Sequence, residues 1–376
     1  MEPVVSATFF LANAIVKGLE SGEFVRWGGV IREASSGRIV TFLRETGSTA
    51  TQIPQRLQQA EALLQVGSAA SVLSLGVSVM GFALVMQRLN ELEQRLKQAE
   101  ELLKKIDRKI DLGFYANFRA ALDLANIAFT TSQQKNRERA AFQAIDRFLA
   151  AQHHYFDYAN TELAQGSQIA DEYLLTLCLA YIAEARCHLE LGEPDTAMSR
   201  FQEGATKIRA CIQRYIELLL TSNPAVYLQP QFKEQIDLRR LTRIYQWIDP
   251  TLDENAVFQM QRENLFKIAR EPNKWVESLP AAILTRVEVQ GGWLGPSQDD
   301  LRREANNRLP NLLEVMESMV ETNRRFEAYQ AEVAAIAQLG ISFHDWLQLA
   351  PATEEKPEEA ELMYIIPSQP LDVAVA

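Results

Sequence analysis

The chain has little of what catalytic and metal sites are usually built from. Its 376 residues include only 4 histidines and 3 cysteines, and they contain no phosphate loop, dinucleotide fingerprint, nucleophile elbow or zinc-protease motif. The cysteines, Cys178, Cys187 and Cys211, are odd in number and irregular in spacing, which argues against a disulfide framework and favours a reducing compartment. These absences predict a protein that is not an enzyme and has no cofactor or metal.

Positive charge is also scarce. The formal net charge is −11 and no basic patch of real size offsets it, so we expect no nucleic-acid partner, and no feature indicates a small-molecule substrate. The N-terminus is apolar, but Glu2 stands where a secretory signal needs positive charge, and the apolar spacing of 4–19 is near-helical. We therefore expect no signal peptide. The protein is expected to be cytoplasmic, or to lie at the membrane surface and insert conditionally.

What is present predicts a mainly α fold: an elongated helical bundle with two long helices, a middle of helical hairpins and a small N-terminal β-hairpin. The predicted segments are an N-terminal helix and β-hairpin (1–54), a long apolar and coiled-coil helix (55–113), helical hairpins (114–220), irregular short helices (221–296), a long C-terminal helix with a docking helix (297–350) and an acidic, partly mobile tail (351–376).

The β-hairpin is predicted from two apolar, β-branched runs, Val30-Ile31 and 39–42, which flank a turn at Gly37. A helix broken at Gly28-Gly29 is the alternative. Because two strands alone are marginal, the hairpin must pack on helices, and the apolar run 363–366 near the C-terminus is expected to add to its edge.

The longest apolar run is VGSAASVLSLGVSVMGFALVM, residues 66–86, which has 21 residues and no charge. As a helix it would span about 31 Å, close to the ~30 Å bilayer core. Nine residues are Leu, Val or Phe, but four Ser and three Gly make insertion marginal. Its small residues lie near one face and permit close helix packing. The positions expected to face lipid or another helix are Gly67, Ser71, Ser74, Leu75, Ser78, Val79, Gly81, Phe82 and Val85.

A heptad pattern follows this run directly, with apolar residues separated alternately by three and four positions, as a coiled-coil seam requires. The seam residues are Leu89, Leu92, Leu96, Ala99, Leu103, Ile106 and Ile110. Projected upstream, the same register continues into the apolar run. Acid-first i,i+4 pairs such as Glu91–Arg95 mark a solvated helical face.

Three interpretations of 66–86 stay open: a buried central helix, a constitutive transmembrane helix, and a segment that is buried in one state and inserted or oligomerised in another. The third resembles α-helical pore-forming toxins of the cytolysin A and haemolysin BL type, in which long bundle helices accompany an apolar Gly/Ala/Ser/Val-rich segment. The resemblance covers the architecture of 55–113 and 297–339 and implies membrane activity. The early hairpin and the central helices depart from that pattern.

The central helices share a spacing of small residue, Phe, small residue, in Ala144, Phe148, Ala151 and again in Ala197, Phe201, Gly204. Tyr181 and Ala185 precede the second copy, and Gly192 and Pro194 mark a helix-to-helix turn. Over roughly 136–215 this resembles tetratricopeptide hairpins, with Gly204 in place of the expected Ala, and implies a surface for a protein partner.

Three candidate chemical groups have simpler explanations. His153 and His154 are about 100° apart on a helix, so with Asp157 they make a poor metal site. Cys187-His188 fits a buried helix interior. His344-Asp345 fits a docking turn that starts near Ser342, after a long helix from Ser297 that contains Pro310 and ends at Gly340.

Two functions from different classes follow. The first is a non-enzymatic, membrane-active or membrane-associating helical protein of pore-forming type, with 66–86 as its conditional segment and lipid as a partner. The second is a soluble scaffold or adaptor that assembles with itself or another helical protein through the coiled coil, and binds a partner through its hairpins.

Overall fold

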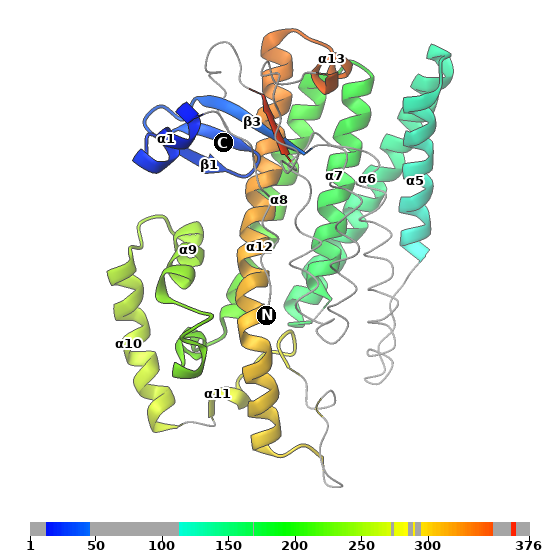
Figure 1. Cartoon of the computed structure of the whole chain (residues 1–376). Coiled ribbons are helices and arrows are strands. Elements are labelled where there is room, and N and C mark those ends of the chain that lie inside the picture. Colours follow the sequence, from blue (N-terminus) through cyan, green and yellow to red (C-terminus); the bar gives the residue numbers. More distant parts are fainter. Residues whose placement is uncertain are drawn as a thin grey trace.

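The computed structural model describes residues 13–45, 113–167, 169–271, 274–284, 289, 295–348 and 362–365, and every structural statement concerns these residues. A mainly α fold with a small antiparallel sheet is confirmed (Figure 1). Of the long helix predicted over 55–113, the structure describes only Gly113, so this prediction lies outside the described residues.

Long helices pack side by side in a bundle (Figure 1). They are α5 (Gly113–Thr130), α6 (Gln134–Ala164), α7 (Ala170–Glu190), α8 (Pro194–Leu220) and α12 (Gln298–Leu339). In chain order α5 contacts α6, α6 contacts α7, α7 contacts α8, and α8 contacts α12. Because the connections within α5–α8 are short, helices that follow one another in sequence become neighbours in space. The helical hairpins predicted over 114–220 are confirmed.

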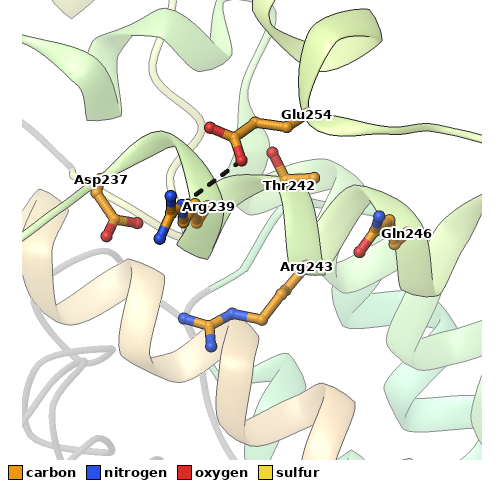
Figure 2. Close-up of a pocket in the computed structure, with 6 residues that line it drawn as sticks. All are labelled: Asp237, Arg239, Thr242, Arg243, Gln246 and Glu254. Atoms are coloured by element: carbon orange, nitrogen blue, oxygen red, sulfur yellow. Dashed lines mark ion pairs between the residues drawn. The ribbon is translucent and has the colours of Figure 1, made fainter. Parts of the chain in front are cut away.

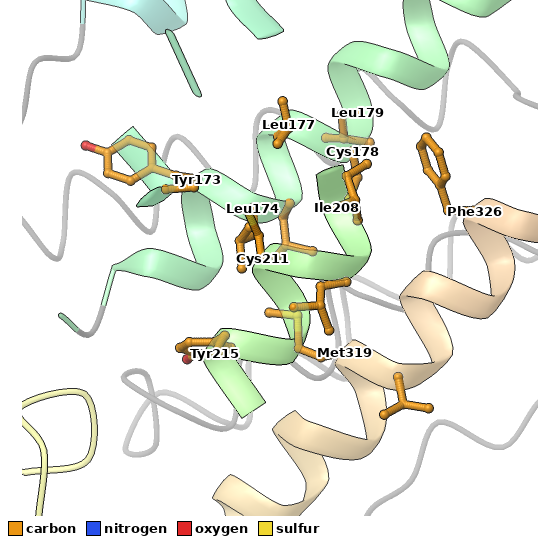
Figure 3. Packing of buried hydrophobic residues seen from close by; sticks show 14 of the residues in the cluster. Tyr173, Leu174, Leu177, Cys178, Leu179, Ile208, Cys211, Tyr215, Met319 and Phe326 are labelled. Atoms are coloured by element: carbon orange, nitrogen blue, oxygen red, sulfur yellow. The ribbon is translucent and has the colours of Figure 1, made fainter. Parts of the chain in front are cut away.

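Helix α7 is buried on every side, from Ala170 to Leu189. Its middle, 173–183, is apolar on all sides apart from Thr176, and a helix of this kind must be covered all round. Side chains of α7, α8 and α12 interleave in the core (Figure 3). Phe326 of α12 meets Tyr181 and Phe201 edge-on, with ring centroids 6.2 and 5.2 Å apart, so α12 closes the bundle over α7 and α8.

The predicted hairpin is part of a larger sheet. Strands β2 (Val30–Glu33) and β3 (Ile39–Glu45) pair antiparallel, with Gly37 in the turn at φ +73°. A further strand, β1 (Phe24–Trp27), pairs with β2 through a turn at Gly28-Gly29, so a two-stranded hairpin was too small and the alternative of a broken helix is wrong. Helix α1 (Asn13–Ser21) contacts β1.

The C-terminal part of the chain completes this sheet. Strand β4 (Leu362–Ile365) pairs antiparallel with β3, placing Ile365 opposite Phe42 and Leu362 opposite Glu45. The strand order is β1-β2-β3-β4. The expectation that this apolar run joins the edge of the early β element is confirmed.

Shorter helices lie between α8 and α12: 3-10 turns η3 (Pro224–Leu228) and η4 (Pro230–Phe232), then α9 (Leu238–Ile248), α10 (Glu254–Arg270) and α11 (Lys274–Glu277). Helix α13 (Phe343–Gln348) follows α12. The Asp237 side chain caps α9 and the Asp253 side chain caps α10, which explains where both helices begin. Trp247 and Trp275 are buried, whereas Trp293 lies outside the described residues.

Helix α12 has the predicted ends. Ser297 forms a capping box with Asp300, and Gly340 ends the helix at φ +63°. Pro310 lies inside a single helix of 42 residues, and the helix does not restart there. The Ser342 hydroxyl accepts from Asp345 N–H at 3.1 Å, which caps α13 as expected.

Candidate interaction surfaces

The residues predicted to face lipid or another helix all lie outside the described residues. They are Gly67, Ser71, Ser74, Leu75, Ser78, Val79, Gly81, Phe82 and Val85 of the apolar run, and Leu89, Leu92, Leu96, Leu103, Ile106 and Ile110 of the seam. The described part shows instead which surfaces are already occupied by the bundle and which remain accessible.

A buried polar cluster joins α6, α7 and α8. Glu184 is 0% exposed, and its carboxylate accepts from Gln152 Nε2 at 2.5 Å and from Arg200 Nε at 2.8 Å. Arg200 also donates to Gln152 Oε1 at 2.6 Å, which closes a triangle of hydrogen bonds. The pairing compensates a buried charge and fixes the three helices in register. The sequence signal for this cluster is Glu184 in the largely apolar segment of α7, and the cluster was not predicted from it.

His188 extends this cluster to the turn between α7 and α8. Its Nδ1 lies 2.9 Å from Glu193 and its Nε2 lies 3.8 Å from Glu184. Burial alone would lower the pKa of His188, but hydrogen bonding to the two glutamates and their charges outweigh it, so the net pKa is raised. His188 therefore joins the end of α7 to the turn before α8 through two glutamates, in a helix interior as expected, and its neighbour Cys187 is also buried.

Polar pairs fasten the sheet and α9 to α12. Arg26 of β1 makes a bidentate ion pair with Glu321 at 2.9 and 3.2 Å, and Trp27 Nε1 donates to Glu327 at 2.7 Å. Arg240 of α9 makes a second bidentate pair with Glu317. These polar residues of α12 are thus engaged in intramolecular contacts.

A pocket of about 490 Å³ opens along α9 and the start of α10 (Figure 2). It is lined by Asp237, Arg239, Thr242, Arg243, Gln246 and Glu254. Arg239 lies 3.6 Å from Glu254, and the two arginines balance the two acids, so the lining has no net charge. Small-molecule sites are usually closed and mostly apolar, and this pocket is open and polar. It has no chemistry that selects one ligand.

Large apolar side chains are exposed on several elements, including α5, α6 and α10. Phe258 and Phe266 of α10 are 46% and 60% exposed, and Ile127 of α5 is 50% exposed. In contrast, the small and aromatic residues that carry the tetratricopeptide-type spacing are packed inside the bundle: Ala144, Phe148, Ala151, Ala197, Phe201 and Gly204. The exposed large apolar side chains of the described residues therefore lie away from those positions, and α10 contributes three of them, Phe258, Met260 and Phe266.

The candidate chemical groups remain dispersed. His153, His154 and Asp157 are exposed, and no cluster of metal-ligating residues occurs within the described ranges. The three cysteines are free and buried, and burial raises the pKa of each thiol, which disfavours a reactive thiolate. Asp345 is engaged in the cap of α13.

Among the helices that the structure describes, none is long and apolar enough to cross a membrane. No family model, curated protein or solved structure matches the chain.

Proposed function

We propose that the chain is a non-enzymatic, membrane-associating helical protein in which 66–86 is the segment that contacts lipid. The observation that carries the proposal is the length of this run: 21 uncharged residues, about 31 Å as a helix, against a bilayer core of ~30 Å. Since no described helix has this property, the proposal rests on 66–86 alone.

The first described helix after this run in the sequence, α5, is tightly packed in the bundle. The heptads that follow 66–86 lead into α5, whose aromatic residues are locked against α6. Phe118 and Phe148 meet edge-on at 5.6 Å, and Tyr115 and Tyr155 do so at 5.8 Å.

Energetics favour conditional contact over permanent anchoring. The nine Leu, Val and Phe residues contribute roughly −3 to −5 kcal/mol to insertion, and the Ser and Gly residues reduce that gain. Because the free energy of insertion of 66–86 is small, protein can cover the segment in one state and lipid in another, as pore formation requires.

Flotation of the full chain with anionic liposomes, together with release of an entrapped dye, tests this function. Val79→Asp places a charge near the centre of the run and costs about 3 kcal/mol of insertion, so we expect flotation to fall by about 100-fold. Val79→Leu is the matched control and should float like the wild type. The proposal fails if the wild type neither binds nor permeabilises liposomes at any pH, or if Val79→Asp unfolds the bundle itself.

The exposed α10 face favours a second candidate, a scaffold or adaptor that binds a protein partner. Phe258 and Phe266 lie eight residues apart, about 80° around the helix, so they flank one face. Cross-linking in cell extract would test it, with Phe258→Ser/Phe266→Ser as the variant and the exposed, off-face Met260→Ser as control. Equal recovery of partners by both proteins would reject this candidate.

A further inference from the structure

Arginines from five elements gather around one stretch of α12, residues 321–327. This arginine cluster consists of Arg26 of β1, Arg32 of β2, Arg209 of α8, Arg243 of α9 and Arg324 of α12 itself. Among the described residues, the carboxylates that act on these guanidinium groups are those of Glu321 and Glu327. Five positive charges against two negative ones leave a local excess of positive charge, in a chain whose formal net charge is −11.

Both carboxylates are already shared with other donors. Glu321 accepts from Arg26 at 2.9 and 3.2 Å, and it also accepts from Arg325 at 3.1 Å. Glu327 accepts from Trp27 Nε1 at 2.7 Å. The acids of α12 therefore do not balance the arginine cluster, and some of its members have no carboxylate of their own.

Arg324 is half-buried and makes no ion pair with a described carboxylate. Its guanidinium carbon lies 4.8 Å from the centre of the Trp27 ring, and its Nε is buried without a hydrogen-bond partner among the described residues. Burial lowers the pKa of Arg324, the two glutamates act in the opposite direction, and the charges of Arg26 and Arg243 lower it further. A guanidinium in these surroundings is stabilised by an anion that accepts hydrogen bonds from it.

Arg243 approaches the same stretch of α12 from α9. The Arg240–Glu317 ion pair and the hydrogen bond from Trp247 Nε1 to Asn323, at 3.2 Å, hold α9 beside α12. Along α9, Arg243 lies between these two contacts. Its guanidinium extends toward α12 in Figure 2, and it makes no hydrogen bond or ion pair with a described residue. Because Arg243 is exposed, a ligand can reach it from solvent.

We propose that Arg243 and Arg324 bind a phosphate group between α9 and α12, in the positive field of Arg26 and Arg32. A guanidinium presents planar, paired N–H donors that match the oxygens of a phosphate. A phosphate monoester carries about two negative charges, which offset most of the local excess, whereas a carboxylate carries one. Soluble phosphate esters and phosphomonoester lipid headgroups share this chemistry. The site goes beyond the membrane function and does not depend on 66–86.

Thermal unfolding of the full chain in inorganic pyrophosphate tests the site. The melting temperature of the wild type should rise with pyrophosphate, and by more than in sodium chloride of the same ionic strength. Arg243→Gln should weaken the apparent affinity by about 10-fold, because it removes charge-assisted hydrogen bonds at a partly screened position. Without pyrophosphate, Arg243→Gln should unfold no earlier than the wild type, since it loses no contact with a described residue.

Arg239→Gln is the matched control. It removes the same charge from the same helix, but the Arg239 side chain is 79% exposed and pairs with Glu254, so the response to pyrophosphate should stay that of the wild type. A wild type that does not respond, a response that sodium chloride equals, or equal losses of affinity in the two variants would overturn the proposal.

Vesicles distinguish the two sources of phosphate, and the Val79→Asp background removes the contribution proposed for 66–86. In that background, binding to phosphatidic acid vesicles but not to phosphatidylcholine vesicles, with competition by pyrophosphate, would identify a lipid headgroup. Binding of pyrophosphate without binding of vesicles would identify a soluble phosphate ester. Either result supports the site when Arg243→Gln weakens the binding. Binding that Arg243→Gln and Arg324→Gln both leave unchanged would overturn it, whereas loss of flotation in Val79→Asp alone concerns only the membrane function.

Discussion

Glu184 shows how much a single polar side chain contributes to helix packing. Its buried carboxylate accepts from Gln152 and Arg200, so Glu184→Ala removes the acceptor that both donors share and leaves Arg200 with Glu203 and the Gln152 carbonyl oxygen alone. We expect the free energy of unfolding to fall by about 3 kcal/mol. Urea denaturation measures it. Glu217→Ala on the exposed side of α8 should change it by less than about 0.5 kcal/mol. Equal effects of the two substitutions would show that the triangle has no special role.

His188 makes stability depend on pH. Its pKa in the folded chain is raised, because Glu184 and Glu193 outweigh the effect of burial. Protonation therefore stabilises the fold fully below the unfolded pKa of about 6.5, and this contribution is lost as the pH rises through the higher folded value. Thermal unfolding at a series of pH values should show the wild type losing more stability than His188→Gln as the pH rises above about 6.5. Parallel curves would assign the pH dependence to other groups.

At the scale of elements, Gly204 sets how closely α8 approaches α7 and α12. A Cβ at this position would lie 2.8 Å from Tyr181 Cδ1 and 2.9 Å from Phe326 Cζ, both in buried rings. Gly204→Ala should therefore destabilise the fold by about 1–3 kcal/mol, although Ala is the better helix former by about 1 kcal/mol. Chemical denaturation checks this, with the exposed Thr206→Ala as control. A gain in stability would mean that the rings move aside freely.

Elements were predictable where local signals set them. The caps of α9, α10 and α12 and the turn before Pro194 depend on neighbouring residues, and the sequence contains them. Strand β1 was not predictable in this way. The turn that joins β1 to β2 requires glycine at position 28, because its φ is +55° and a Cβ there would come within 2.4 Å of the Arg324 carbonyl oxygen. That contact joins positions almost 300 residues apart. The Glu184 cluster escaped prediction for the same reason, because its partners come from three helices.

At the scale of the whole molecule, α12 connects parts that are distant in sequence. It contacts α8, α9, α11, η3 and β1, so the bundle, the short C-terminal helices and the sheet share one support. Its glutamates accept hydrogen bonds from Arg26 and Trp27 of β1 and from Arg240 of α9. Its Phe326 packs against Tyr181 of α7 and Phe201 of α8. The bundle helix α8 and the strand β1 therefore both contact the same helix, α12.

One sheet contains both the first strands of the described chain and its last, β4. Strand β4 supplies the outer partner of β3, with Leu43 opposite Tyr364 and Arg44 opposite Met363. A chain that ends after residue 361 would leave the outer edge of β3 unpaired, and an open edge invites pairing between molecules. We expect it to unfold at a lower temperature and to scatter more light on heating than a chain that ends after Pro367 and keeps β4. Identical unfolding and scattering of the two truncated chains would mean that β4 neither stabilises nor protects the sheet.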